Sequence, residues 1–219
     1  MTVDPTSSPG PAPTEVVAGA PGAQLVIISG PSGVGKDTII EALRDRPRDP
    51  DYHYVVTCTT RAPRPGEVDG ISYHFLDRER FLELRDAGAL LEANEVHGNW
   101  YGTPRREVAK ALAAGRDVIL KIDVQGAQVV KERIPDALLI FIVPPSLEAL
   151  FQRLRSRATE TANELEIRQR NAAIELARQG DYDHVVVNDD DEVDRTAAEI
   201  EAIIEQEKRR NAERQIRVG

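Results

Sequence analysis

Short apolar runs, separated by amphipathic stretches, dominate the hydrophobic pattern of this chain. The runs that are rich in β-branched residues and do not alternate with polar positions lie at 24–29, 117–122, 137–143 and 184–188. Such runs are typical of strands that are buried on both faces of a parallel sheet. The stretches that predict helices lie at 36–45, 104–114, 147–157 and 193–210. Because strands and helices alternate, the pattern predicts a doubly wound α/β core.

Two blocks of the chain depart from this alternation. Residues 54–103 contain two shorter strand candidates, at 54–61 and 71–76, followed by a charged helix from 77 to 87. We expect this block to form a small mixed insertion at the carboxyl edge of the sheet, where α/β proteins bind ligands. The second block, 155–172, is polar, rich in arginine and free of glycine. It predicts a mobile helical flap, and a solvated pair of helices is the alternative.

These patterns predict one globular domain between two tails. Residues 1–22 are rich in Pro, Ala and Ser, a composition typical of disordered chain. Residues 211–219 are predicted to form a second tail. The domain at 23–210 is expected to consist of a core (23–53, 104–146 and 173–210), the insertion (54–103) and a lid (147–172).

Composition and charge narrow the classes of function. The formal net charge of −9 argues against a surface that binds DNA through its phosphates. The longest apolar runs are far too short to span a bilayer, and the first residues lack the basic start and apolar run of a secretory signal. The single cysteine, Cys58, fits a reducing compartment and is expected to be a small strand residue. We therefore expect a cytoplasmic protein that binds neither nucleic acid nor membrane.

The segment GPSGVGKDT at 30–38 carries the first candidate chemistry. It follows a predicted strand and opens a predicted helix, which is the context that a phosphate-binding loop requires. Its glycines, Gly30, Gly33 and Gly35, allow the backbone to turn its N–H groups inward, and the helix adds the positive end of its dipole. Lys36 supplies a cation for the terminal phosphates. The segment therefore predicts a nucleotide phosphate site.

Asp37 stands where the pattern G-x-x-x-x-G-K-[ST] has a hydroxyl that ligates Mg²⁺. A carboxylate is also a hard oxygen ligand, so our hypothesis is that Asp37 binds Mg²⁺ directly or through water. Thr38 cannot replace it, because it leaves the helix about 100° further round. A weakened or inactive site is the alternative.

A second anion site is indicated by the stretch TCTTRAPRPGEVDGISYHFL. Arg61 and Arg64 lie in a loop that its prolines hold extended, and guanidinium groups bind phosphate in bidentate fashion. With the hydroxyls of Thr57 and Tyr73 they form a plausible anion receptor. A solvated basic loop is the alternative.

The motifs GPSGVGK, TTRAPRPGEVDGISYHF, LLEANEVHGNWYGT, LKIDVQGAQVVK, RLRSRATET and YDHVVVND occur in this order. Over residues 23–207 the chain thereby resembles the guanylate kinase family. The resemblance implies a P-loop NTPase-type core with a GMP-binding insertion and a helical lid. It also implies transfer of the γ-phosphate of ATP to GMP, and to dGMP, with Mg²⁺ as cofactor. The expected assembly is a monomer or homodimer.

The resemblance also implies roles for individual residues. The expected ATP-binding residues are Gly30, Pro31, Ser32, Gly33, Val34, Gly35, Lys36, Asp37, Thr38 and Asn188. The expected GMP-binding residues are Thr57, Arg61, Arg64, Tyr73, Glu92, Tyr101, Thr103 and Asp123. The expected catalytic residues are Lys36, Arg61, Arg157 and Arg168, the last two in the lid. Without the flanking motifs, Glu92 and Asp123 would each be interpreted as surface carboxylates. Asn188 is equally consistent with a turn residue at the end of a strand.

The chain departs from the family pattern at several positions besides Asp37. Lys121 stands where an acid is frequent, Trp100 where Tyr is usual, Thr57 where Ser is frequent and Ala158 where Gly is usual. Lys121 is expected to place a cation near phosphates or to pair with Asp123. Two alternatives to the GMP kinase stay open: a catalytically weakened guanylate-kinase-like module that binds protein partners, and a kinase of related fold with another phosphorylated substrate.

Overall fold

The computed structural model describes residues 16–96, 98–156 and 162–219. At its centre is a five-stranded sheet in the order β10-β9-β2-β8-β3, and every neighbouring pair in it is parallel. Its strands are β2 (Leu25–Ser29), β3 (His53–Tyr54), β8 (Val118–Lys121), β9 (Leu138–Val143) and β10 (His184–Val187). The four predicted core strands and their parallel arrangement are confirmed.

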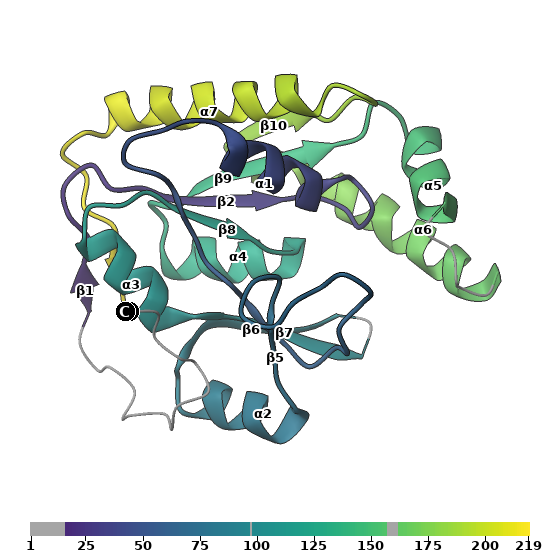
Figure 1. Cartoon of the computed structure of the whole chain (residues 1–219), viewed down its shortest axis with the longest axis horizontal. Coiled ribbons are helices and arrows are strands. Elements are labelled where there is room, and N and C mark those ends of the chain that lie inside the picture. Colours follow the sequence, from purple (N-terminus) through teal and green to yellow (C-terminus); the bar gives the residue numbers. More distant parts are fainter. Residues whose placement is uncertain (1–15, 97, 157–161) are drawn as a thin grey trace.

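Helices cover both faces of this sheet (Figure 1). One face packs against α1 (Lys36–Asp45) and α7 (Val193–Arg210), and the other against α3 (Arg105–Ala113) and α4 (Val124–Arg133). Neighbouring side chains of each strand point to opposite faces, so both faces of β2 are buried in apolar surroundings. This double burial explains why the strands read as continuous apolar runs.

Helix α4 was not among the predicted helices. Its first turn contains Gly126, which lowers helix propensity. The structure compensates with an N-cap, because the Asp123 carboxylate accepts hydrogen bonds from the N–H groups of Gln125 (2.8 Å) and Gly126 (2.9 Å).

The insertion forms a second, mixed sheet in the order β5-β4-β7-β6. Its elements are β4 (Cys58–Thr59), β5 (His74–Phe75), α2 (Arg78–Asp86), β6 (Leu90–Val96) and β7 (Asn99–Pro104). The prediction of one strand at 54–61 is wrong, because its first residue, Tyr54, belongs to β3 of the main sheet and only Cys58–Thr59 joins the small sheet. Cys58 is a strand residue of β4, as predicted, and it is fully buried in the apolar cluster of this insertion.

The lid segment contains α5 (Leu147–Ser156), α6 (Ala162–Leu176) and a short 3₁₀ turn, η1 (Ala177–Asp181). The α6 helix continues beyond residue 172, where the predicted flap ends. Ala172 is fully buried in the core cluster that also holds α1 and α7, so this end of α6 is anchored to the domain.

The predicted tails differ from the structure where they are described. Strand β1 (Val17–Ala18) pairs antiparallel with β11 (Arg217–Val218), which brings the two ends of the described chain together. Ile216 and Val218 are buried in the cluster beside α3, and this burial explains why residues 16–22 and 211–219 are not tails. Residues 1–15 lie outside the described part of the chain. Among the described helices, none combines the length and the apolar character that a membrane crossing requires.

Candidate active site

A cleft of about 490 Å³ opens between the loop after β2, the insertion and the lid helix α6. The predicted site residues that line it are Gly30, Ser32, Gly33, Val34, Gly35, Lys36, Asp37, Thr57, Arg61, Arg64, Tyr73, Glu92, Tyr101, Asp123 and Arg168. Four predicted residues do not line it: Pro31, Thr38, Thr103 and Asn188. Arg157 lies outside the described residues. One cleft thus brings together most residues of both predicted nucleotide sites.

The phosphate loop follows β2 directly and depends on its glycines. Gly30 lies against the carbonyl oxygen of Ile142 on the neighbouring strand β9, so closely that a Cβ atom has no room. Gly35 has φ 99°, and a Cβ atom there would lie 2.6 Å from the side-chain nitrogen of Asn188. These contacts explain in physical terms why glycine stands at both positions.

Lys36 begins α1 and folds back over this loop. Its ammonium donates to the carbonyl oxygens of Gly30 (2.5 Å) and Pro31 (3.0 Å). Burial lowers the pKa of Lys36. The negative charges of Glu175, Asp37 and Asp123 partly offset this shift. The loop therefore holds a desolvated cation at the position where a phosphate would meet the N-terminus of α1.

The Val34 carbonyl connects the loop to the core. It accepts hydrogen bonds from the side chain of Asn188 (2.8 Å) and from Arg153 of α5 (3.1 Å). Arg153 also donates to the Asn188 carbonyl (2.9 Å) and pairs with Asp190 (2.6 Å). Asn188 was expected to contact ATP, but the structure buries it beneath the loop, because its amide satisfies a loop carbonyl there. Arg153 was missed, although it lies one turn before Arg157 in an arginine-rich stretch.

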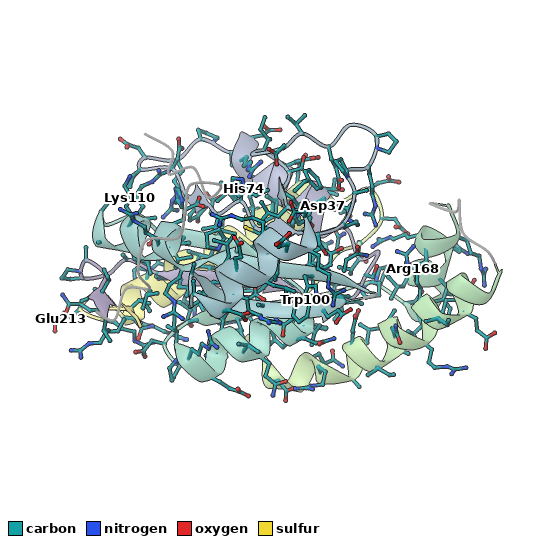
Figure 2. All side chains as sticks on the ribbon, turned by 90° about the horizontal axis from the view of Figure 1, so that it is seen from below. Asp37, His74, Trp100, Lys110, Arg168 and Glu213 are labelled. Carbon is teal, nitrogen blue, oxygen red and sulfur yellow. The ribbon has the colours of Figure 1, made fainter. Side chains whose placement is uncertain are left out.

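Two residues of α6 contact the tip of the loop at Ser32. Arg168 donates to the Ser32 hydroxyl (3.0 Å), and the Glu175 carboxylate accepts from the Ser32 N–H (3.0 Å). They lie about two turns apart on one face of α6. Figure 2 labels Arg168 on this helix and Asp37 at the start of α1. Glu175 was not predicted, since nothing in its local sequence relates it to Ser32.

Arg61 and Arg64 both donate hydrogen bonds to the carboxylate of Glu67, Arg61 through its side chain and Arg64 through its backbone. The Arg61 guanidinium donates to Glu67 (2.8 Å) and to the Ala62 carbonyl (2.7 Å), and the N–H of Arg64 donates to Glu67 (2.7 Å). Burial opposes ionisation of Glu67, but the bonds from Arg61 and Arg64 outweigh it and hold the Glu67 pKa below its usual range. Glu67 thus keeps the two predicted anion-binding residues in one compact loop.

Two tyrosines, Tyr73 and Tyr101, lie beside these arginines in the cleft. The Tyr73 ring lies 5.4 Å from the Arg61 guanidinium carbon, measured to the ring centroid, and packs edge-to-face with Tyr101 at 6.2 Å. The two aromatic side chains come from different parts of the insertion, so the small sheet is what assembles the receptor.

Glu92 lies on β6 of the insertion and is almost fully buried, at 2 % exposure. One carboxylate oxygen accepts from the Thr103 hydroxyl (2.7 Å) and the other from the Asn94 amide (2.7 Å). Burial raises the pKa of Glu92 to about 7. Thr103 therefore contacts the cleft only through Glu92. Asn94 was missed, although its position two residues along β6 places it on the same side of the strand as Glu92.

Asp37 forms an ion pair that the sequence analysis did not predict. Its carboxylate contacts the ammonium of Lys121, the last residue of β8. Burial alone would lower the pKa of Lys121, but Tyr73 and Asp37 outweigh it and raise the pKa above its usual value. Within the described residues, no three His, Cys, Asp or Glu side chains are grouped so that they could hold a metal ion.

Comparisons with known proteins agree with this geometry. The family model described as guanylate kinase matches residues 22–207. A guanylate kinase from Mycobacterium tuberculosis is 47 % identical over 183 residues, covering 82 % of this chain and 87 % of the relative. One from Symbiobacterium thermophilum is 49 % identical over 187 residues, covering 85 % and 86 %.

The solved structures include a comparable match. The crystal structure of guanylate kinase from Anaplasma phagocytophilum is 33 % identical, covers 90 % of each chain and aligns with a TM-score of 0.70. Both the sequence and the fold relate this protein to the same group over most of its length, and the chain belongs to the guanylate kinase family.

Proposed function

We propose that this protein transfers the γ-phosphoryl group of ATP to GMP, and also to dGMP, giving ADP and the nucleoside diphosphate. The observation that carries the proposal is the single cleft, which is lined by the phosphate loop with Lys36 and by the receptor residues Arg61 and Glu92. A phosphoryl transfer requires two anionic substrates in line, and this cleft offers a cationic site for each.

The donor half would bind ATP through the backbone. The N–H groups of the loop and the positive end of α1 face the β- and γ-phosphates, and Lys36 exchanges its two loop carbonyls for phosphate oxygens. Arg168 lies at Ser32, on the lid side of the same loop, so it would approach the transferred group as the lid closes. Arg157 is proposed for the same role.

The acceptor half would recognise guanine by its donors. Guanine presents an N1–H and an N2 amino group, and the ionised carboxylate of Glu92 can accept from both. The bonds from Thr103 and Asn94 orient this carboxylate. Adenine lacks the donor pair and would leave a buried carboxylate unpaired, which is a strong ground for rejection. Asp123 at the cleft is proposed as a further acceptor for the base.

The acceptor phosphate would bind the guanidinium groups of Arg61 and Arg64, with the hydroxyls of Thr57, Tyr73 and Tyr101 around it. The reaction forms a bond between a GMP phosphate oxygen and the γ-phosphorus, and breaks the bond from that phosphorus to the bridging oxygen of ADP. The attacking oxygen is already anionic, so no general base is required.

Mg²⁺ is proposed as the cofactor, and the residues present fit it. The ion takes oxygen ligands and is commonly held by one or two carboxylates together with substrate phosphates and water. Asp37 supplies a carboxylate beside the phosphate loop, so it would hold the ion directly or through water. When bound, the ion supplies positive charge that offsets the charge on the phosphate oxygens.

A catalytically weakened module that binds proteins is the second candidate of the family type. The described cleft favours the enzyme, because the phosphate loop, Lys36 and the acceptor arginines are all present in it.

The direct test is a coupled assay of ADP release with ATP and one of GMP, dGMP, AMP, UMP or CMP. We expect turnover with GMP and dGMP at least 100-fold above that with AMP, since a buried acceptor left unpaired is strongly discriminating. A preference for AMP or a pyrimidine nucleotide would contradict the assignment of Glu92. Absence of turnover with all five would support the protein-binding module.

A further inference from the structure

Lys121 lies where the two halves of the cleft meet. It ends β8, and in the sheet register it is opposite Ile28 of β2, just before the phosphate loop begins. Its side chain is 23 % exposed and lines the cleft. The carboxyl ends of adjacent parallel strands thus bring a lysine to the position where donor and acceptor phosphates must approach each other.

The contacts of Lys121 come from both halves. On the donor side its ammonium pairs with the carboxylate of Asp37, in the first turn of α1. On the acceptor side it lies 5.1 Å from the centroid of the Tyr73 ring, in the same receptor as Arg61.

The pair also relates two unusual features of the sequence. A carboxylate at position 37 beside a polyphosphate is unfavourable by itself, because like charges repel. An ammonium that is largely shielded from water at position 121 is also unfavourable by itself. Placed in contact, each neutralises the other, and the structure holds a cation at the centre of the cleft without excess charge.

We propose that Lys121 is a further catalytic residue of the phosphoryl transfer, and that Asp37 is the residue that positions it. The inference rests on the proposed function. When both nucleotides are bound, the Lys121 ammonium donates to oxygens of the transferred phosphoryl group and of the acceptor phosphate. It reduces the repulsion between the two anions and transfers neither a proton nor an electron.

The chemistry favours lysine for this position. An ammonium is a compact point charge on a flexible stem, so it can keep one bond to Asp37 and turn its other donors to phosphate. Because the charge on the phosphoryl oxygens develops during transfer, a cation held in place beforehand acts more on the transition state than on ground-state binding.

The test compares K121M, K121R, D37N and the double variant D37N/K121M under saturating ATP, GMP and Mg²⁺. We expect K121M to lower kcat about 100-fold, with the KM for GMP changed less than about threefold. K121R should restore part of the loss because it restores the charge. D37N should lower kcat about tenfold, and the loss in the double variant should be smaller than the product of the two single losses, since part of the effect of Asp37 acts through Lys121.

Controls separate this role from a structural one. K131M removes a lysine of α4 that pairs with Asp183 outside the cleft, and it should keep the kcat of the unmodified protein. Thermal unfolding of K121M and K121R should remain within a few degrees of the unmodified protein. A K121M variant with unchanged kcat would overturn the proposal. So would losses that multiply fully in the double variant, which would show that Asp37 does not position Lys121 and acts at the metal alone.

Failure of the proposal for Lys121 can be distinguished from failure of the proposed function. An unmodified protein that does not phosphorylate GMP contradicts the function assigned above. The role of Lys121 at the transferred group is then judged by calorimetry with ADP in the presence of aluminium fluoride, which mimics the transferred phosphoryl group. K121M should lower this affinity about tenfold, while K131M leaves it unchanged. Equal affinity of K121M and the unmodified protein for this mimic would contradict the inference in that case.

Discussion

The two halves of the cleft are built in different ways. The proposed donor half is centred on one continuous segment, residues 30–38, in which backbone groups and Lys36 face the cleft. The proposed acceptor half takes its side chains from β6, β7 and the loops that flank β4, which the small mixed sheet brings together. A backbone site tolerates changes of side chain, whereas a site of converging side chains depends on each one. We therefore expect substitutions in the donor half and in the acceptor half to affect different kinetic parameters.

The largest effect is expected in the donor half. K36M removes the cation that the loop holds over its own carbonyls, and kcat should fall about 1,000-fold. Because the acceptor half is assembled separately, calorimetry should show GMP binding within about threefold of the unmodified protein. A parallel loss of GMP binding would contradict the separation of the two halves.

This contrast also explains what the sequence predicted and what it did not. The phosphate loop and the helix at 36–45 are local features, so spacing alone located them. The hydrogen bond from Thr103 to Glu92 crosses the hairpin of β6 and β7, and the bond from Ser32 to Glu175 joins the loop to the lid. Such contacts depend on tertiary packing, and no local pattern encodes them.

The boundaries of the short strands were also poorly predicted from the local sequence pattern. The short strands of the insertion were predicted too long, because strands of two residues, such as Cys58–Thr59, carry too little periodic signal. Asn188 was located by its motif, yet its contact with Val34 depends on how β10 lies beside the loop.

The next largest effect is expected at Glu92. An amide in place of the carboxylate cannot accept from both guanine donors, so E92Q should lower kcat/KM for GMP about 100-fold. The KM for ATP should remain unchanged. The matched control is E95Q, an exposed carboxylate on the same strand, which should behave as the unmodified protein. A loss confined to kcat, or an equal loss in E95Q, would contradict the base-reading role.

A smaller, graded effect is expected from pH. Burial raises the pKa of Glu92 to about 7, with Asp123 acting in the same direction and Thr103, Asn94 and Arg133 opposing it. The carboxyl is therefore protonated below this pH and cannot accept both guanine donors. The KM for GMP should rise as pH falls through 7, by up to about tenfold per pH unit, and stay level above it.

The E92Q variant is the control for this profile. Its side chain does not titrate, so the remaining dependence reports other groups, including the substrate phosphate. The difference between the two profiles isolates Glu92. Parallel profiles for the two proteins would show that Glu92 does not titrate in the range where GMP binds.

The smallest effect is expected where the lid contacts the loop. The Glu175 carboxylate occupies the N–H of Ser32 and adds a negative charge near Lys36. E175Q keeps the shape and removes the charge, so the KM for ATP should fall about threefold, as repulsion of the γ-phosphate weakens. Stopped-flow binding of a fluorescent ATP analogue measures the change, and an increased KM would indicate that Glu175 supports the loop instead.

The central claim is that a single cleft holds both nucleotides, one by loop amides and one by converging side chains. A crystal structure with GMP and a non-hydrolysable ATP analogue tests it most directly. The account predicts guanine N1 and N2 within hydrogen-bond distance of the Glu92 carboxylate, and Lys36 transferred from the carbonyl of Gly30 to a phosphate oxygen. A guanine bound away from Glu92, or a triphosphate bound away from the loop, would contradict it.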